Sequence, residues 1–333
     1  MSKLETNHRV LAGVLALVIG AMLLLTGCSA SNPAVTSASA STLKGKITVS
    51  GAFALYPIVV RWAEEFQKIH PGVQFDISAG GAGKGVADTL GGMADIGMVS
   101  RQVFPEEVAK GAVYVAAVID AVVPVASAGN PARDDLLAKG ITKQTFADIW
   151  IGGRVSNWKD IFPAAGAVGK TDLHVFTRSD AAGAADTWAL FLGDKKQEDL
   201  LGTGVYGDPG LAETVRKDPL GIGYNNIGFA YDARTRKQVD GLVIIPIDID
   251  GNGKIDPEEA VYGSLDDLNH AIAKKVYPWP PARDLNLVAL KQFAGVTREF
   301  VRWALTDGQK YASEAGYVAL PEDRIQQELD KLQ

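Results

Sequence analysis

The sequence predicts an α/β fold in which parallel strands alternate with helices. Two β-prone segments, residues 46–50 and 73–77, each run into a glycine-containing turn and then into a helix. In the first of these helices, apolar residues recur at helical spacing, namely Leu55, Val59, Trp62, Phe66 and Ile69. A third β-prone segment, residues 95–99, ends at Ser100-Arg101. Repeated β-turn-α units are typical of a parallel sheet, and ligands bind at the carboxyl ends of its strands.

Length and composition favour two domains. The chain has 333 residues, of which 47% are hydrophobic and 22% are charged. This is ordinary globular composition, with enough apolar material for two cores. A long apolar stretch at 113–125 is long enough to connect two lobes. The formal net charge is -6 and no basic patch dominates, so we expect no nucleic-acid partner.

The N-terminus has the pattern of a targeting segment. Charged residues precede an apolar stretch at 10–25, which ends in Leu25-Thr26-Gly27-Cys28. We expect residues 1–27 to be a signal peptide. The ending on cysteine resembles the bacterial lipobox, which implies lipid on Cys28 and an extracytoplasmic protein anchored to the cell membrane. Residues 28–43 are predicted to form a flexible tether. The alternative is an uncleaved membrane anchor, for which the apolar run is slightly short.

Three glycine-containing turns, at 51–53, 80–85 and 181–184, each open a predicted helix. A helix N-terminus presents unpaired N–H groups and a partial positive charge, so three such ends that converge would hold an anion. Arg101 and Arg178 follow predicted strands beside these turns, and a guanidinium fits a tetrahedral oxyanion. The alternatives are ordinary structural turns, and arginines held in surface or inter-lobe salt bridges.

The sequence favours a binding protein over an enzyme. It has no Gly-x-Ser-x-Gly motif, and its four histidines are widely spaced. Its single cysteine, Cys28, excludes an intramolecular disulfide and a Cys-based zinc site. The turn at 80–85 is no P-loop, because Ser78 stands where the first glycine is required and Gly85 follows Lys84. A surface phosphatase stays as a less favoured alternative.

Residues 248–259 match the calcium-binding loop of an EF-hand. The pattern supplies oxygen ligands at the expected spacing, and Gly253 permits the sharp turn. The predicted ligands are Asp248, Asp250, Asn252, Lys254 through its carbonyl, Asp256 and Glu259. Because the preceding segment at 243–247 is β-prone, we expect a single loop that binds Ca²⁺ for structural purposes. The alternative is an acidic turn without a metal.

Taken in order, these motifs resemble the phosphate-binding proteins of bacterial ABC importers. The likeness spans residues 45–322. It rests on the segments 50–53, 78–83, 94–101, 178–184, 221–224, 277–283, 308–310 and 315–318. The resemblance implies a two-lobed type II periplasmic-binding-protein fold with a ligand cleft between the lobes. It places residues 44–122 and 283–333 in lobe 1, and 123–282 in lobe 2.

The resemblance also implies a function and a site. A monomer would capture phosphate and deliver it to an ABC permease. Arg178 would form the charged contact, and Ser100 stands where well-known members place an aspartate that accepts the phosphate proton, with Arg101 next to it. The expected backbone contacts come from Ala52, Phe53, Gly80, Gly81, Gly183 and Ala184.

Two departures from the family pattern bear on which anion is bound. Ala182 and Ala184 replace hydroxyl-bearing residues of the arginine loop, and Ser100-Arg101 replaces the acidic proton acceptor. A site made of backbone donors and arginine holds any tetrahedral oxyanion, so sulfate, tungstate and molybdate stay as alternatives. Asp180 is a further candidate for the missing carboxylate. The EF-like loop by itself would also permit a calcium-stabilised adhesion module.

Overall fold

The computed structural model describes residues 43–164, 169 and 171–333, and these belong to one compact unit. The predicted signal peptide, Cys28 and the tether up to residue 42 lie outside the described residues. Among the helices that are described, none combines the length and the apolar character needed to cross a membrane.

The first half of the sheet contains the three strands that the sequence predicts near its start. The strands are β1 (Lys44–Gly51), β2 (Gly72–Ala79) and β3 (Ile96–Val99), and β1 lies between the other two and parallel to both. Helix α1 (Tyr56–Ile69) connects β1 to β2, and α2 (Ala82–Leu90) connects β2 to β3. The predicted β-turn-α units are therefore confirmed.

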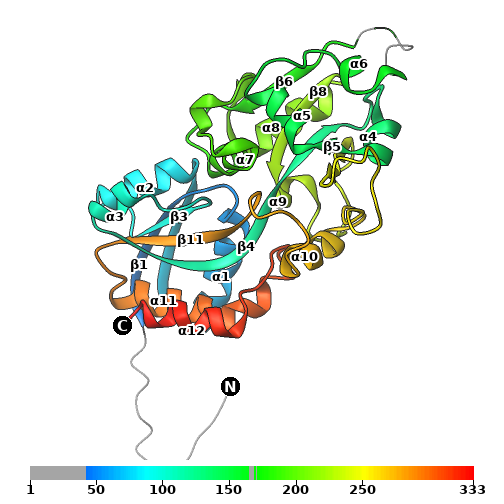
Figure 1. The fold of residues 1–333 in the computed structure, drawn as a ribbon. Coiled ribbons are helices and arrows are strands. Elements are labelled where there is room, and N and C mark those ends of the chain that lie inside the picture. The colour runs from blue at the N-terminus through cyan, green and yellow to red at the C-terminus, as the bar shows by residue number, and fades with distance from the viewer. Residues whose placement is uncertain (1–42, 165–168, 170) are drawn as a thin grey trace, which may run out of the picture. The chain divides into compact units, whose positions relative to one another are not determined.

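Strand β4 (Ala112–Ser127) belongs to both halves of the sheet. Up to Ala121 it pairs with β11 (Ala282–Leu290), which also pairs with β3. From Val122 onward it pairs with β8 (Gly221–Asn226) instead. Figure 1 shows β4 running from the strands of the first half to those of the second. The second half continues with β6 (His174–Arg178) and β7 (Thr203–Val205), and β9 (Leu242–Ile244) pairs with the end of β4.

The remaining elements cover the sheet or connect its strands (Figure 1). Helix α7 (Gly183–Gly193) follows β6, and α8 (Gly207–Lys217) follows β7. The others are α3 (Pro105–Ala109), α4 (Arg133–Lys139), β5 (Ile141–Thr142), α5 (Lys143–Trp150), α6 (Trp158–Ile161), η2 (Gln197–Asp199), α9 (Ile227–Ala230), β10 (Ile247–Asp248), α10 (Leu265–Ala273), α11 (Gly295–Leu305), η3 (Asp307–Tyr311) and α12 (Glu322–Asp330).

Each half of the sheet packs against its own aromatic cluster. In the first half, the ring of Phe300 on α11 lies 5.4 Å from Phe66 and 4.8 Å from Phe75, between ring centroids. In the second half, Trp188 on α7 lies 5.5 Å from Trp150 and stacks on Tyr224 at 5.7 Å. Such aromatic contacts stabilise a core beyond simple area burial. They hold α7 firmly against the sheet, which fixes the position of its N-terminus.

Candidate functional site

The three predicted anion-binding turns meet at the carboxyl ends of β1, β2 and β6. Gly83 in the second turn donates its N–H to the carbonyl oxygen of Ala181 in the third, at 3.0 Å. A Cβ placed on Gly81 would lie 2.8 Å from Oδ2 of Asp180. A Cβ on Gly183 would overlap the carbonyl and hydroxyl oxygens of Ser100. Glycine is therefore required where the second and third turns approach their neighbours.

Several predicted backbone donors are already used within the first two turns. The N–H of Ala52 donates to the carbonyl oxygen of Met98 at 2.9 Å. Gly80 and Gly81 both donate to the carbonyl oxygen of Gly51, at 2.8 and 3.1 Å. These bonds hold the turns together, so in this conformation the three N–H groups would not be free for an anion.

Other predicted donors are in a better position. Gly183 and Ala184 are the first residues of α7, where a helix leaves its N–H groups without intrahelical partners. Within the described residues, the N–H of Phe53 donates to no protein acceptor. Its ring packs beside Gly207 and lies 5.6 Å from the Arg178 guanidinium carbon. Phe53 thus lies beside Arg178 at the end of β6, and Gly183 and Ala184 begin the helix that follows this strand.

Arg178 lies between two buried carboxylates. Its Nε and Nη2 donate to Asp180 at 2.8 and 2.6 Å, and its Nη1 donates to Asp208 at 2.7 Å. Burial opposes the charge of Arg178, but Asp208 and Asp180 outweigh burial and raise the pKa of Arg178 above its ordinary value. A guanidinium has five N–H groups, and three are used here, which leaves two for a ligand. These contacts fit the salt-bridge alternative, and the predicted role of Arg178 as an anion contact stays a prediction.

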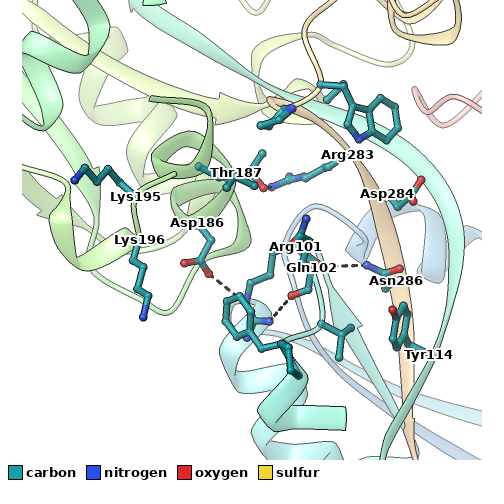
Figure 2. A pocket seen from close by; sticks show the side chains of 17 residues that line it. Arg101, Gln102, Tyr114, Asp186, Thr187, Lys195, Lys196, Arg283, Asp284 and Asn286 are labelled. Carbon is teal, nitrogen blue, oxygen red and sulfur yellow. Dashed lines mark hydrogen bonds and ion pairs between the residues drawn. The ribbon is translucent and has the colours of Figure 1, made fainter. Parts of the chain in front are cut away.

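Arg101 has a different environment. Its two terminal nitrogens donate to Glu107 at 2.9 and 2.7 Å, and its Nε lies 3.2 Å from Asp186 on α7. The guanidinium carbon lies 4.0 Å from the centre of the Phe104 ring. Figure 2 shows Arg101 beside Asp186 at a cavity next to the turns. Its partners fit the salt-bridge alternative, and its predicted role as an anion contact stays a prediction.

A buried polar network extends from Arg178 to the strands shared by the two halves, and sequence reasoning missed it. Asn226 donates from Nδ2 to Asp208 at 2.7 Å and accepts a hydrogen bond from Arg283 on β11. Arg283 also donates to Asp120 on β4 at 2.8 Å and to the carbonyl oxygen of Gly183 at 2.8 Å. The pKa of Asp208 is raised, mainly because the carboxyl is buried.

A second group that the sequence did not single out lies at the first two turns. Ser50 Oγ donates to Asp88 at 2.5 Å and accepts from Lys84 Nζ at 3.1 Å, and Lys84 also contacts Asp88. Burial opposes the charge of Asp88, but Lys84 and Ser50 outweigh it, so the pKa of Asp88 is lowered. Lys84 is thus engaged with an acidic partner on its own helix.

The predicted calcium loop brings three of its carboxylates together. Oxygen atoms of Asp248, Asp250 and Glu259 all lie within 4.8 Å of one another. Asp248 and Glu259 are buried, and in the described part of the chain neither pairs with a cation. By contrast, Asp256 contacts Lys254 and accepts from Asn252 at 2.6 Å. Backbone N–H groups donate to both buried carboxylates, and an all-oxygen set with no cationic side chain fits a hard divalent cation.

Comparison with known proteins identifies the family. A family model described as "PBP superfamily domain" matches residues 36–307. The chain belongs to the PBP superfamily. This PBP chain is 27% identical over 319 residues to "Phosphate-binding protein PstS" of Staphylococcus epidermidis, covering 95% of this chain and 90% of that protein. It is 25% identical to "Phosphate-binding protein PstS" of Methanocaldococcus jannaschii, and the alignment covers 93% of this chain and 92% of that protein.

Solved structures agree with the fold of this PBP chain. A putative phosphate ABC transporter substrate-binding protein from Clostridium perfringens matches with a TM-score of 0.66 at 20% identity, covering 83% of this chain and 100% of that chain. An ABC-type phosphate transport receptor from Vibrio cholerae matches with a TM-score of 0.59 at 21% identity, covering 83% and 100%. The predicted two-lobed type II periplasmic-binding fold is confirmed.

Proposed function

We propose that this PBP chain is an extracytoplasmic solute-binding protein that captures phosphate and delivers it to an ABC permease. The observation that carries the proposal is the meeting of the turns at 80–85 and 181–184 beside the buried Arg178. Relatives named phosphate-binding protein PstS align over nearly the whole chain, which supports the same assignment.

The proposed capture mechanism follows from the donors around Arg178. An oxyanion that leaves water must regain its hydrogen bonds from preset groups. The first N–H groups of α7 and the N–H of Phe53 supply neutral donors, and the positive end of the helix favours negative charge. Arg178 supplies a charge-assisted contact through the N–H groups that Asp180 and Asp208 leave free.

Charge balance around Arg178 favours phosphate over sulfate. Asp180 and Asp208 together outnumber the single cation that both contact. Sulfate has no proton, so it can only place acceptor oxygens against these carboxylates. Phosphate near neutral pH still carries at least one proton, which it can donate to an acceptor in the site. A carboxylate that repels sulfate can therefore accept a hydrogen bond from phosphate.

Titration calorimetry of the purified chain with phosphate, sulfate and tungstate tests this proposal. We expect phosphate to bind with the highest affinity and in one-to-one ratio. Arg178→Lys keeps the charge that Asp180 and Asp208 require but removes the planar fork, and should weaken phosphate binding at least about tenfold, or about 1.4 kcal/mol. Arg216→Lys, in an exposed pair with Glu213, is the matched control and should leave the affinity unchanged.

The competing oxyanions define what would overturn the assignment. If sulfate, tungstate or molybdate binds and phosphate gives no heat, the protein serves a different anion. If Arg178→Lys binds phosphate as tightly as the unaltered chain, the arginine does not contact the ligand. Turnover of a phosphomonoester by the pure chain would instead favour the phosphatase alternative.

Lipid anchoring and the lobe boundaries complete the proposal. We infer that residues 1–27 are removed and that Cys28 carries the lipid, with residues 28–43 as the tether. Mass spectrometry of the mature N-terminus decides this, because an unmodified Cys28 would exclude an anchor there. Lobe 1 would comprise residues 44–122 and 283–333. The change of β4 partners from β11 to β8 supports a crossing at this point.

We also propose that the loop at 248–259 binds a structural Ca²⁺. Asp248, Asp250 and Glu259 would hold the ion, and their mutual repulsion without it should make the loop less stable. Added Ca²⁺ should therefore raise the melting temperature, and Asp248→Asn should abolish the rise. Glu258→Gln changes an exposed carboxylate outside the cluster, so this control variant should still show the Ca²⁺-dependent rise in melting temperature. If Ca²⁺ raises the melting temperature of Asp248→Asn as much as that of the unaltered chain, the loop is not the Ca²⁺ site.

A further inference from the structure

A cavity of about 520 Å³ lies beside the Arg101–Asp186 pair, next to the third turn, because the cavity-lining Arg283 donates to the Gly183 carbonyl. It is bounded by the segment that follows β3, by α7 and the residues after it, and by β4 and β11. Its volume falls within the range of sites that hold small organic molecules. Of the predicted anion-binding residues, only Arg101 is among those that line it.

The cavity has an aromatic wall. Phe104, Tyr114 and Trp279 line it, together with Leu190 and Pro280. The three aromatic residues remain 40%, 37% and 44% exposed, although large apolar side chains are usually covered. Arg101 covers one face of Phe104, and Lys331 Nζ lies 5.4 Å from the centre of the Tyr114 ring. The surface left for a planar ligand is that of Trp279 and the uncovered parts of the other two rings.

The opposite wall carries positive charge. Figure 2 shows Lys195 and Lys196 on one side of the cavity and Tyr114 on the other, with Arg101 and Asp186 between them. Both lysines follow the end of α7 and are exposed. Within the described residues, neither lysine forms an ion pair.

The other charged residues of the lining are already balanced. Arg101 pairs with Glu107 and Asp186, and Arg283 pairs with Asp120. Asp284 pairs with Arg324. The positive side chains left for a ligand on the α7 side are therefore Lys195 and Lys196, which are flanked in the same segment by Asp194, Glu198 and Asp199. Asn286, Gln102 and Thr187 add polar groups to the lining.

We propose that this cavity is a second binding site, which takes a small organic anion with a planar apolar body. The body lies against Tyr114 and Trp279, and the anionic group faces Lys195 and Lys196. Inorganic oxyanions lack the apolar body and gain nothing from the aromatic wall. The site is therefore distinct in chemistry from the proposed phosphate site, and it does not depend on which oxyanion that site binds.

Two fluorescent probes with almost the same body test the proposal. 1-Anilinonaphthalene-8-sulfonate carries an anionic group, and N-phenyl-1-naphthylamine is its neutral counterpart. Both are titrated into the full chain in the presence of saturating phosphate, so that the oxyanion site is filled. We expect the sulfonate to bind once per chain and at least about tenfold more tightly than the neutral probe, because only the sulfonate contacts the lysines.

Variants of the two walls separate their contributions. The double substitution Lys195→Gln and Lys196→Gln should lower the affinity for the sulfonate about tenfold and leave the affinity for the neutral probe unchanged. Trp279→Ala should weaken the binding of both probes. If this variant fails to fold, Tyr114→Ala replaces it, with the same expected result. The controls are Lys237→Gln and Tyr206→Ala, which change exposed side chains outside the cavity lining. They should affect neither probe.

Either of two results would overturn the proposal. One is sulfonate binding that the lysine and aromatic variants leave unchanged. The other is an equal loss of binding in the control variants, which would mean that the probe covers the general surface.

Discussion

Arg101 and Arg178 both follow a strand of the sheet, yet their surroundings give them different capacities. Arg178 keeps N–H groups that can contact a ligand beside the first residues of α7. Arg101 is held by Glu107 on α3 and by Asp186 on α7. The same residue type at corresponding positions is thus proposed to bind the anion in one case, and connects two helices in the other.

Glu107 should make stability depend on pH. Burial opposes its charge, but hydrogen bonds from Arg101 and from the N–H of Phe104 outweigh burial, so its pKa lies below the ordinary value of 4.5. A carboxyl whose pKa is lowered by folding stabilises the protein above that ordinary value, and the contribution is lost as pH falls through the lower folded pKa. Glu107→Gln should therefore lose less stability than the unaltered chain between about pH 5 and pH 3.

Thermal unfolding followed across this pH range measures the difference. Glu106→Gln changes the exposed neighbour on α3 and should keep the slope of the unaltered chain. A Glu107→Gln slope that matches the unaltered chain would mean that the Arg101 contact does not persist in solution.

At the scale of single residues, sequence reasoning singled out Arg178 but did not predict its partners. The strand-turn-helix pattern located Arg178 and its neighbours, because those contacts are local. Asp208 is 30 residues away, on α8, and its role depends on how α8 packs beside β6. No local pattern around Gly207-Asp208-Pro209 indicates a buried partner for an arginine.

Among the elements, α7 and the end of β3 approach so closely that only glycine fits. A Cβ on Gly183 would overlap the backbone of Ser100, and Arg283 donates to the carbonyl of Gly183 from β11. The N-terminus of α7 is therefore fixed from two sides. A fixed N-terminus gives preset donors, which cost little to organise when a ligand binds.

Gly183→Ala should weaken phosphate binding at least about tenfold, because α7 would have to move away from Ser100. Within a helix, alanine is more favourable than glycine by about 1 kcal/mol. Helix propensity by itself would therefore predict that the substitution stabilises the protein. The measurements are calorimetric affinity and melting temperature. Gly228→Ala is the control, since an added Cβ there meets nothing within 4 Å. Unchanged affinity in Gly183→Ala would show that the contact does not position the donors.

The elements themselves were predictable to different degrees. The first three strands and their turns follow from local alternation and glycine placement, and the structure confirms them. The stretch at 113–125 was expected to connect two lobes, and β4 does run through both halves of the sheet. The insertion of β11 between β3 and β4 was not predictable, because its partners lie more than a hundred residues earlier in the chain.

Across the whole molecule, a few contacts join the first half of the sheet to the second on the ligand side. They are the Arg101–Asp186 pair, the hydrogen bond from Gly83 to Ala181, and the approach of Gly183 to Ser100. A binding protein of this fold must break such contacts to admit or release a ligand. Their strength therefore contributes to how long a ligand stays bound.

Asp186→Asn should speed phosphate release. The substitution removes an ionic contact between the halves, while Glu107 still compensates Arg101, so the fold should lose little stability. We expect the dissociation rate at pH 8 to rise about two- to tenfold, equivalent to about 0.4–1.4 kcal/mol. Stopped-flow kinetics measures this rate, and Asp134→Asn, an exposed residue of α4, is the control. An unchanged rate would mean that the pair does not hold the halves together.

Strand β4 has a consequence for how the chain folds. Because its 16 residues supply hydrogen-bond partners to β11 in one half and to β8 and β9 in the other, neither half can lose its order without exposing an unpaired edge in its neighbour. The two lobes that would separate mechanically during transport are therefore not independent thermodynamic units. Heat should disrupt them in a single cooperative step, even though the two lobes move as separate bodies when they open and close around a ligand.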